Sequence, residues 1–182
     1  IRNQFCGEGV LFVEQREQLG TGHAVLQAKD AFSDFEGTVV ILCGDVPLLT
    51  AATVRQLLTC HREHAATLTV LTAVLENPGS YGRVLTGRDH TVEKIVEARD
   101  ATPEELRIRE INTGIYCVES GFLFSAVPRI GCANAQCEYY LTDIFDIARR
   151  EQKKAVACAI DNPPEAMGIN TRVHLAEAEA IL

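Results

Sequence analysis

An apolar, β-branched segment at residues 38–43 ends abruptly at Gly44-Asp45-Val46-Pro47. A segment that is apolar on both faces is typical of a strand buried within a parallel sheet, and Pro47 prevents the strand from continuing. Asp45 then stands at the carboxyl end of the strand, where open α/β sheets bind their ligands. A carboxylate there either holds a divalent cation, and through it a phosphate, or caps the next helix. The local sequence favours neither alternative.

Strand-like and helix-like segments alternate along most of the chain, which predicts βαβ units and a mostly parallel sheet flanked by helices. We expect Thr21 and Thr50 to cap the first two helices, and Thr171 or Asn170 to cap the last. His61 and His64 are expected on the surface of the second helix. The predicted strands are residues 10–13, 38–43, 66–75, 110–118 and 155–160, and the predicted helices are 21–32, 50–64, 103–109, 121–129, 141–152 and 171–182. Residues 81–85 and 91–96 flank Gly87-Arg88-Asp89-His90 and predict a small β-hairpin.

Composition excludes several classes of partner. The net charge of −8 argues against a nucleic-acid surface and against an anionic membrane surface. No segment approaches the roughly 20 apolar residues of a membrane span. The seven cysteines are odd in number and none has the two-residue spacing of a zinc or redox motif, which suits free thiols in a reducing cytoplasm. These cysteines are Cys6, Cys43, Cys60, Cys117, Cys132, Cys137 and Cys158.

Four short motifs carry polar groups that are suited to ligand binding. Residues 18–23 form a glycine-rich turn that leads into a helix, and such a turn can bind an anion or a base edge. Asn112 lies inside an apolar strand and must be hydrogen-bonded, either by a turn or by a ligand. Glu97 ends a strand and faces either ligand or solvent. Asn170 follows Gly168-Ile169 and, taken alone, is better explained as a helix cap than as a ligand.

Taken in order, these motifs resemble one family, the uridyltransferase domain of the bacterial bifunctional N-acetylglucosamine-1-phosphate uridyltransferase / glucosamine-1-phosphate acetyltransferase. The resemblance spans nearly the whole chain, and the segment from Asn134 to Asp143 is particularly specific for it. The residues that carry the resemblance are 17–24, 44–48, 81–84, 95–97, 100–102, 110–115, 134–136, 138–143 and 168–172. The resemblance implies a Rossmann-like nucleotide-diphospho-sugar transferase fold.

The resemblance also implies a reaction, a cofactor and residue roles. The family transfers a uridylyl group from UTP to N-acetylglucosamine 1-phosphate, giving UDP-N-acetylglucosamine, a precursor for peptidoglycan and lipopolysaccharide, and pyrophosphate. The implied ligands of Mg²⁺ are Asp45, which is also the catalytic carboxylate, and Asn170. The implied contacts are Gln15, Gly20 and Thr21 with the uracil, Cys43 and Gly44 beside the nucleotide, and Gly82, Glu97 and Asn112 with the N-acetylglucosamine moiety. Residues near 134–140 would line the sugar side.

The sequence departs from the family in two places. The family's Leu-Ala-Ala-Gly-x-Gly-Thr-Arg-Met loop and its downstream Lys, which hold the triphosphate, do not occur in these 182 residues, and neither does the acetyltransferase β-helix through which relatives trimerise. We therefore expect residues 1–182 to be a partial sugar-nucleotidyltransferase domain, without the first strand and loop, that is inactive or nearly so alone. The alternatives are a nucleotidyltransferase for another sugar phosphate and a non-catalytic nucleotide-sugar-binding module.

Overall fold

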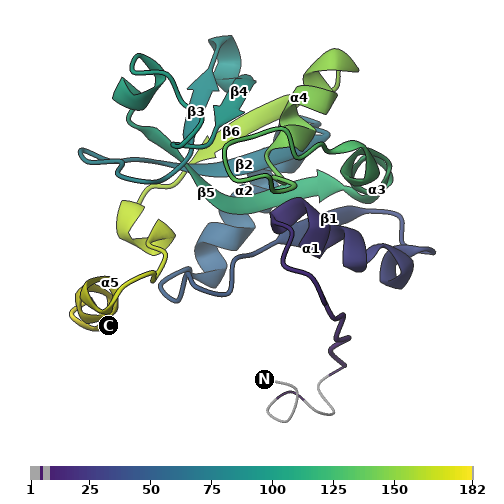
Figure 1. The fold of residues 1–182 in the computed structure, drawn as a ribbon, viewed down its shortest axis with the longest axis horizontal. Helices are drawn as coiled ribbons and strands as arrows, with labels where there is room; N and C mark the ends of the chain where they lie inside the picture. The colour runs from purple at the N-terminus through teal and green to yellow at the C-terminus, as the bar shows by residue number, and fades with distance from the viewer. Residues whose placement is uncertain (1–4, 6–8, 182) are drawn as a thin grey trace.

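Six strands form one mixed sheet in the computed structural model, which describes Phe5 and residues 9–181 (Figure 1). The strands are β1 (Thr38–Ile41), β2 (Leu68–Val74), β3 (Arg83–Thr86), β4 (Val92–Val96), β5 (Glu110–Glu119) and β6 (Ala155–Ala159). The α-helices are α1 (Thr21–Gln27), α2 (Ala51–Glu63), α3 (Ser120–Ala126), α4 (Asp143–Arg150) and α5 (Arg172–Glu179). Short 3₁₀ turns are η2 (Lys29–Phe32), η3 (Arg88–His90), η4 (Glu105–Arg107), η5 (Val127–Arg129) and η6 (Pro163–Ala166).

The directions of the strands differ from the sequence-based expectation. The strand order is β4-β3-β5-β2-β6, with β1 also paired to β5. Among the described ladders only β2 with β6 is parallel, so the prediction of a mostly parallel sheet is wrong. β1 itself runs antiparallel to β5 and is only half-buried. An apolar strand fits either direction when helices cover the sheet, and therefore composition alone did not determine the pairing.

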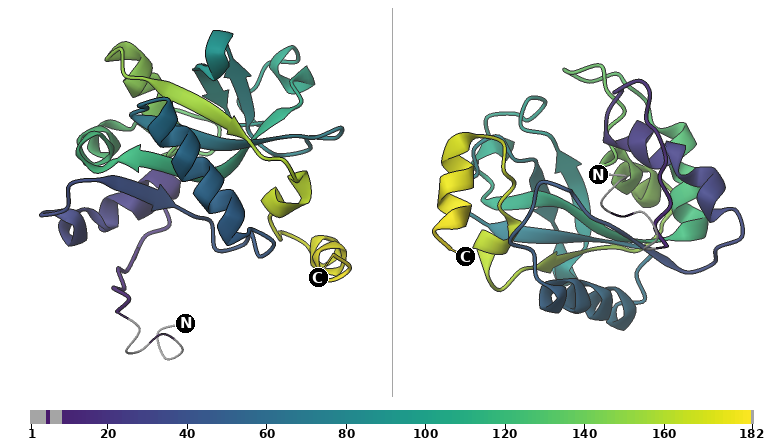
Figure 2. Two further views of the ribbon diagram at one scale, coloured as in Figure 1. Left: turned by 180° about the vertical axis from the view of Figure 1, so that it is seen from behind. Right: turned by 90° about the horizontal axis from the view of Figure 1, so that it is seen from below.

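Helices cover both faces of this sheet (Figure 2). Helix α2 packs on one face, where Leu57 contacts a cluster that includes Leu71 of β2 and Ile115 of β5. Helices α1, α3 and α4 pack on the other face, around a cluster that includes Leu123 and Ile144. The α/β fold class with a small hairpin is confirmed, since β3 and β4 pair as an antiparallel hairpin.

Several local predictions hold, and others need correction. The Thr50 and Thr171 hydroxyls cap α2 and α5, as expected. Each accepts a hydrogen bond from the backbone N–H three residues further along the chain, that of Thr53 or of His174. Thr21 does not cap α1, because its hydroxyl instead accepts from the N–H of Leu141 at 3.0 Å. His61 is not on the surface, since it is 2% exposed and its ring contacts Thr69 and Glu119.

Two expected elements are absent or reduced within the described residues. Residues 10–13 form no strand; Val10 and Leu11 are exposed and lie on an extended segment that runs away from the sheet (Figure 1). A short run of apolar, strand-favouring residues forms a strand only where a neighbouring edge is available to pair with it. The charged helix expected at 103–109 is a single 3₁₀ turn at 105–107, too short to bury a face.

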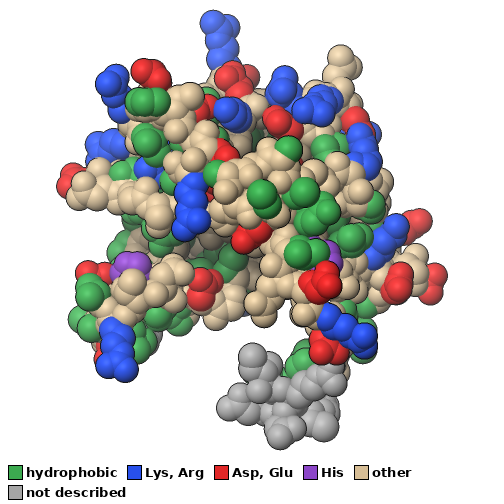
Figure 3. Space-filling view, in the orientation of Figure 1, with side chains coloured by type: hydrophobic (Ala, Val, Ile, Leu, Met, Phe, Trp, Pro, Cys, Tyr) green, Lys and Arg blue, Asp and Glu red, His purple; other side chains and the backbone are tan. Residues whose placement is uncertain are grey.

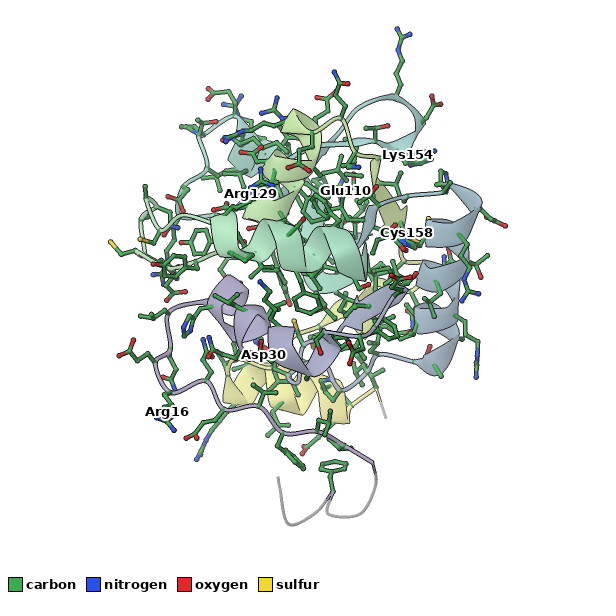
Figure 4. The ribbon with its side chains drawn as sticks, turned by 90° about the vertical axis from the view of Figure 1, so that its right-hand side faces the viewer. Arg16, Asp30, Glu110, Arg129, Lys154 and Cys158 are labelled. Atoms are coloured by element: carbon green, nitrogen blue, oxygen red, sulfur yellow. The ribbon has the colours of Figure 1, made fainter. Side chains whose placement is uncertain are left out.

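The described cysteines are free thiols, and Cys6 lies outside the described residues. Cys117 and Cys158 are buried as expected for small hydrophobes, whereas Cys132 and Cys137 are exposed. Figure 4 shows Cys158 on β6, beside helix α2.

Within the described part of the chain, no helix combines the length and the apolar character that a bilayer crossing requires.

Candidate functional site

Strand β5 contains a bulge at the polar motif that interrupts its apolar sequence. Val70 of β2 pairs with Tyr116 and Thr72 pairs with Asn112, so that three residues of β5 lie opposite the single Leu71. The Thr113 hydroxyl closes the bulge by donating to the Leu71 carbonyl at 2.7 Å and accepting from the N–H of Ile115 at 3.3 Å. Bulges re-aim side chains and are common beside binding sites.

The other edge of β5 is shared by two strands that leave a gap between them. β3 pairs with β5 at Ile111, and β1 pairs with it from Tyr116 onward. A pocket of about 430 Å³ opens between these two pairings. It is lined by Thr21, Ala24, Val25, Ala28, Ile41, Leu42, Cys43, Glu97, Asn112, Gly114, Tyr116, Leu141 and Thr142. The tertiary structure thus brings Thr21, Cys43, Glu97 and Asn112 to one cavity.

The three residues predicted to contact a sugar lie close together, and two of them, Glu97 and Asn112, line this pocket. The Gly82 carbonyl accepts from the N–H of Asn112 at 2.9 Å. A Cβ at Gly82 would lie 3.3 Å from Glu97 Oε2 and 3.4 Å from Asn112 Cβ. A side chain at position 82 would therefore press on the Glu97 carboxylate, which would have to shift by a few tenths of an ångström.

Glu97 is held in a partly desolvated position. Burial raises the pKa of the Glu97 carboxyl, with smaller contributions in the same direction from Asp100 and Asp143, while the Thr142 hydroxyl, donating at 3.3 Å, opposes the shift. Perturbed carboxyl groups in clefts are typical of functional sites. Thr142 was not among the predicted site residues, although it lies in the segment 138–143 that carries the family resemblance.

The glycine-rich turn before α1 is fixed by backbone contacts with residues 138–141. The Tyr139 N–H donates to the Leu19 carbonyl at 2.8 Å, and the Tyr139 carbonyl accepts from the N–H of Gly22 at 2.7 Å. Gly20 has φ +109°, and a Cβ there would lie 2.8 Å from the Tyr139 carbonyl oxygen. Both the backbone conformation and the close approach therefore require glycine at position 20.

Gln15 is tied to this turn although it lies outside regular structure. Its Nε2 donates to the Gly20 carbonyl at 3.1 Å and lies 3.1 Å from His23 Nδ1. Gln27 Nε2 lies 3.1 Å from the other ring nitrogen of His23. Of the predicted base-contacting residues, Gly20 and Thr21 belong to the turn, and Gln15 is hydrogen-bonded to it.

Cys43 and Gly44 follow β1 at the mouth of the pocket. The Cys43 thiol donates to the Gly114 carbonyl at 3.3 Å, and burial, together with the charge of Asp45, raises its pKa. The thiol therefore stays protonated at neutral pH and remains a donor. A Cβ at Gly44 would meet no heavy atom within 4 Å, so the backbone there faces open space.

Asp45 and Asn170, far apart in the sequence, meet beside Gly168. Asp45 Oδ2 and Asn170 Nδ2 each lie 3.5 Å from the position of a Cβ at Gly168. The Asp45 carbonyl accepts from the N–H of Ile169 at 2.8 Å, and the Tyr81 hydroxyl accepts from the N–H of Gly168 at 3.1 Å. These bonds fix residues 168–170 against the end of β1, and Tyr81 is a contact that the sequence analysis did not assign.

The donor set at this point fits Mg²⁺. In the described part of the chain no three His, Cys, Asp or Glu side chains gather as a metal cage. Mg²⁺ does not require one, because it binds through one or two carboxylates, water and substrate phosphates. One Asp carboxylate and one Asn amide, whose O and N atoms are interchangeable by rotation, suit that preference.

The loop at 134–140 is anchored to the segment after β4. Asp100 Oδ1 accepts from the N–H of Ala135 at 2.8 Å, and the Tyr140 hydroxyl donates to Asp100 Oδ2 at 3.4 Å. The Asn134 amide closes the loop by donating to the Glu138 carbonyl at 2.6 Å. The loop therefore lies near Glu97, and Asp100, which the resemblance did not give a role, is its anchor.

In the space-filling view the surface is recessed between α5 and the region of α1 (Figure 3).

The chain is similar to known proteins in sequence and in fold. Residues 4–162 match the family model described as nucleotidyl transferase. The chain is 54% identical to the bifunctional protein GlmU of Geobacter metallireducens over 98% of this chain and 38% of that protein. It is 47% identical to the protein of that name from Halalkalibacterium halodurans, over 97% of this chain and 39% of the relative. The sequence resemblance is thus confirmed, and the chain spans about two-fifths of the length of these curated relatives.

A solved structure shares the fold. The crystal structure of a UDP-glucose pyrophosphorylase complexed with UDP-glucose superposes with a TM-score of 0.64, over 82% of this chain and 57% of that chain. Its sequence is only 15% identical, so this likeness concerns the fold alone. It supports the predicted α/β fold.

Proposed function

Because the chain belongs to the nucleotidyl transferase family, we propose that it carries the site for uridylyl transfer from UTP to N-acetylglucosamine 1-phosphate. The products are UDP-N-acetylglucosamine and pyrophosphate. The proposal follows from the motifs shared with the uridyltransferase half of the bifunctional enzymes and from the relatives at 47% to 54% identity. In the cell the product would serve peptidoglycan and lipopolysaccharide synthesis in the cytoplasm.

One structural observation gives this proposal its strongest support. Asp45 Oδ2 and the Asn170 amide lie against the same point at Gly168, although no local pattern around Asn170 distinguishes it from a helix cap. A cap is not needed from Asn170, because the Thr171 hydroxyl caps α5. The Asn170 side chain is therefore available to hold Mg²⁺ together with Asp45.

The reaction requires alignment more than acid–base chemistry. An oxygen of the sugar 1-phosphate, already anionic, attacks the α-phosphorus of UTP in line, the α–β phosphoanhydride bond breaks, and pyrophosphate leaves with that electron pair. No proton has to be removed from the nucleophile. When bound by Asp45 and Asn170, Mg²⁺ neutralises phosphate charge and orients the phosphates. The chain's own contribution is to hold the two substrates in the orientation that in-line attack requires.

Two groups of residues divide the substrates between them. The turn that contains Gly20 and Thr21, with Gln15 bonded to it, takes the base, and the open backbone at Gly44, with Cys43 beside it, leaves room for the nucleotide. Glu97, Asn112 and the uncrowded Gly82 take the sugar, where a carboxylate acceptor and amide donors match hydroxyl and acetamido groups. The loop at 134–140 lines the sugar side.

A pyrophosphate-release assay on the full-length gene product tests the proposal. UTP is offered with a panel of sugar 1-phosphates, and N-acetylglucosamine 1-phosphate is expected to be the preferred acceptor, with turnover lost in EDTA and restored by Mg²⁺. Preference for another sugar or nucleotide would instead indicate the related-transferase alternative. Binding of UDP-N-acetylglucosamine without turnover would indicate the non-catalytic module.

A further inference from the structure

The side-chain amide of Asn112 has a single orientation that its hydrogen bonds determine. Its Oδ1 atom accepts from the backbone N–H of Gly114 and from the hydroxyl of Tyr116, each at 3.0 Å. A backbone N–H can only donate, so the amide atom facing it must be the oxygen, and the Tyr116 hydroxyl facing the same oxygen must also donate. The Nδ2 group then points away from both.

The Nδ2 group is free to bind a ligand. Within Phe5 and residues 9–181 no protein acceptor is hydrogen-bonded to Asn112 Nδ2. Asn112 and Tyr116 both line the 430 Å³ pocket, alongside Glu97. The pocket therefore presents two N–H donors from Asn112 next to a carboxylate acceptor, which suits neutral groups that both donate and accept, such as sugar hydroxyls and an acetamide.

Tyr116 is unusually well placed to maintain this orientation. It is 3% exposed, and its ring packs on Phe145 with the ring centroids 5.9 Å apart. Burial raises the pKa of its phenol far above the ordinary value, and the Glu97 charge adds to the shift, so the hydroxyl keeps its proton across the working range of pH. Its only hydrogen-bond partner in the described residues is Asn112 Oδ1.

We infer that Tyr116 is a positioning residue for the acceptor substrate, because its hydroxyl holds the Asn112 amide with its N–H donors facing the sugar. This rests on the proposed function and deepens it, since it assigns the discrimination of the sugar moiety to a buried pair rather than to Asn112 alone. Without the hydroxyl, one lone pair of the buried Oδ1 loses its partner and the amide is held by the Gly114 N–H only.

The test compares Tyr116→Phe with wild type in the full-length protein, using steady-state kinetics for both substrates. We expect the KM for N-acetylglucosamine 1-phosphate to rise about five-fold, the factor that about 1 kcal/mol for one hydrogen bond corresponds to. The KM for UTP and kcat should change less than two-fold. Ser125→Ala, which removes a hydroxyl bonded only within α3 at 2.8 Å to the Phe122 carbonyl, is the matched control and should change neither KM.

A double-mutant cycle separates positioning from simple stability. If Tyr116 acts through Asn112, adding Tyr116→Phe to Asn112→Ala leaves the KM for the sugar phosphate as it is in Asn112→Ala alone. Should the Phe variant not be recovered folded, Tyr116→Met, whose flexible side chain adapts to the core, replaces it with the same expectations. Unchanged sugar kinetics, equal changes in both KM values, or additive effects in the cycle would overturn the inference and leave the function standing. A wild-type protein without transfer activity would overturn both.

Discussion

Asp45 and Asn170 place side-chain oxygen and amide groups against one glycine, each 3.5 Å from the position that a Cβ at Gly168 would take. Asp45 follows the first strand, β1, which ends at Ile41, and Asn170 precedes the last helix, α5. The Asp45 carboxylate follows by two residues Cys43, which helps to line the pocket that Glu97 and Asn112 share. The first prediction depends on this relationship.

Asp45→Ala in the full-length protein should lower Mg²⁺-dependent uridylyl transfer by more than about 100-fold, because the only carboxylate of the proposed metal pair is lost. Pyrophosphate release measured over a range of Mg²⁺ concentrations checks this. Asp34→Asn, which changes an exposed carboxylate away from the site, should retain wild-type activity. Activity of Asp45→Ala within a few-fold of wild type would show that Asp45 is not the metal ligand.

Gly20→Ala should destabilise the protein by about 1–3 kcal/mol, since a side chain at φ +109° is strained and its Cβ would lie 2.8 Å from the Tyr139 carbonyl oxygen. The displaced turn carries Thr21 and the Gln15 contact, so the KM for UTP should also rise. Chemical denaturation and substrate titration measure the two effects. Gly131→Ala is the matched control, because a Cβ there meets nothing within 4 Å, and equal stability of the two variants would contradict the prediction.

Glu97→Gln should stabilise the fold at pH 7 while it impairs use of the sugar phosphate. Burial raises the pKa of Glu97 in the folded protein, so the ionised form costs stability above that raised pKa, and the cost disappears as the pH falls below the ordinary value of 4.5. The stability gain of the variant should therefore be present at pH 7 and shrink toward pH 4.5. Urea denaturation at several pH values tests this, and a variant less stable than wild type at pH 7 would refute it.

Glu119→Gln should show the opposite dependence on pH. The hydrogen bond from His61 at 3.0 Å, with that from Thr38, lowers the pKa of the Glu119 carboxyl. A lowered pKa contributes stability above the unfolded value of 4.5 that is lost as the pH falls through the folded pKa. The variant should be less stable than wild type at pH 7, by a small amount because Glu119 is partly exposed, and the two should converge in acid. A difference in melting temperature between variant and wild type that is the same at every pH would contradict this.

Much of the fold could be predicted from local chemistry. Apolar, β-branched segments identified four of the six strands (β1, β2, β5 and β6), and the predicted hairpin supplied the other two (β3 and β4). Threonine hydroxyls at positions 50 and 171 marked the starts of two helices. Strand direction was not predictable in the same way. The segment at 38–43 is apolar enough for a parallel sheet, yet it pairs antiparallel with β5, because a strand's composition reports its burial and not its partner.

The residues of the candidate site were likewise predictable in part. The sequence by itself determined which residues carry chemistry, because Asp45 ends a strand, Asn112 interrupts an apolar one, and the order of the motifs matches one family. Only the tertiary structure decided which of them meet: the bulge in β5 turns Asn112 toward Glu97, and the packing of residues 168–170 against the end of β1 brings Asn170 to Asp45. It also supplied Tyr116 and Thr142, whose roles come from their hydrogen bonds to Asn112 and Glu97. Contacts between distant segments depend on how the sheet is paired and covered, and no local pattern of residues contains that information.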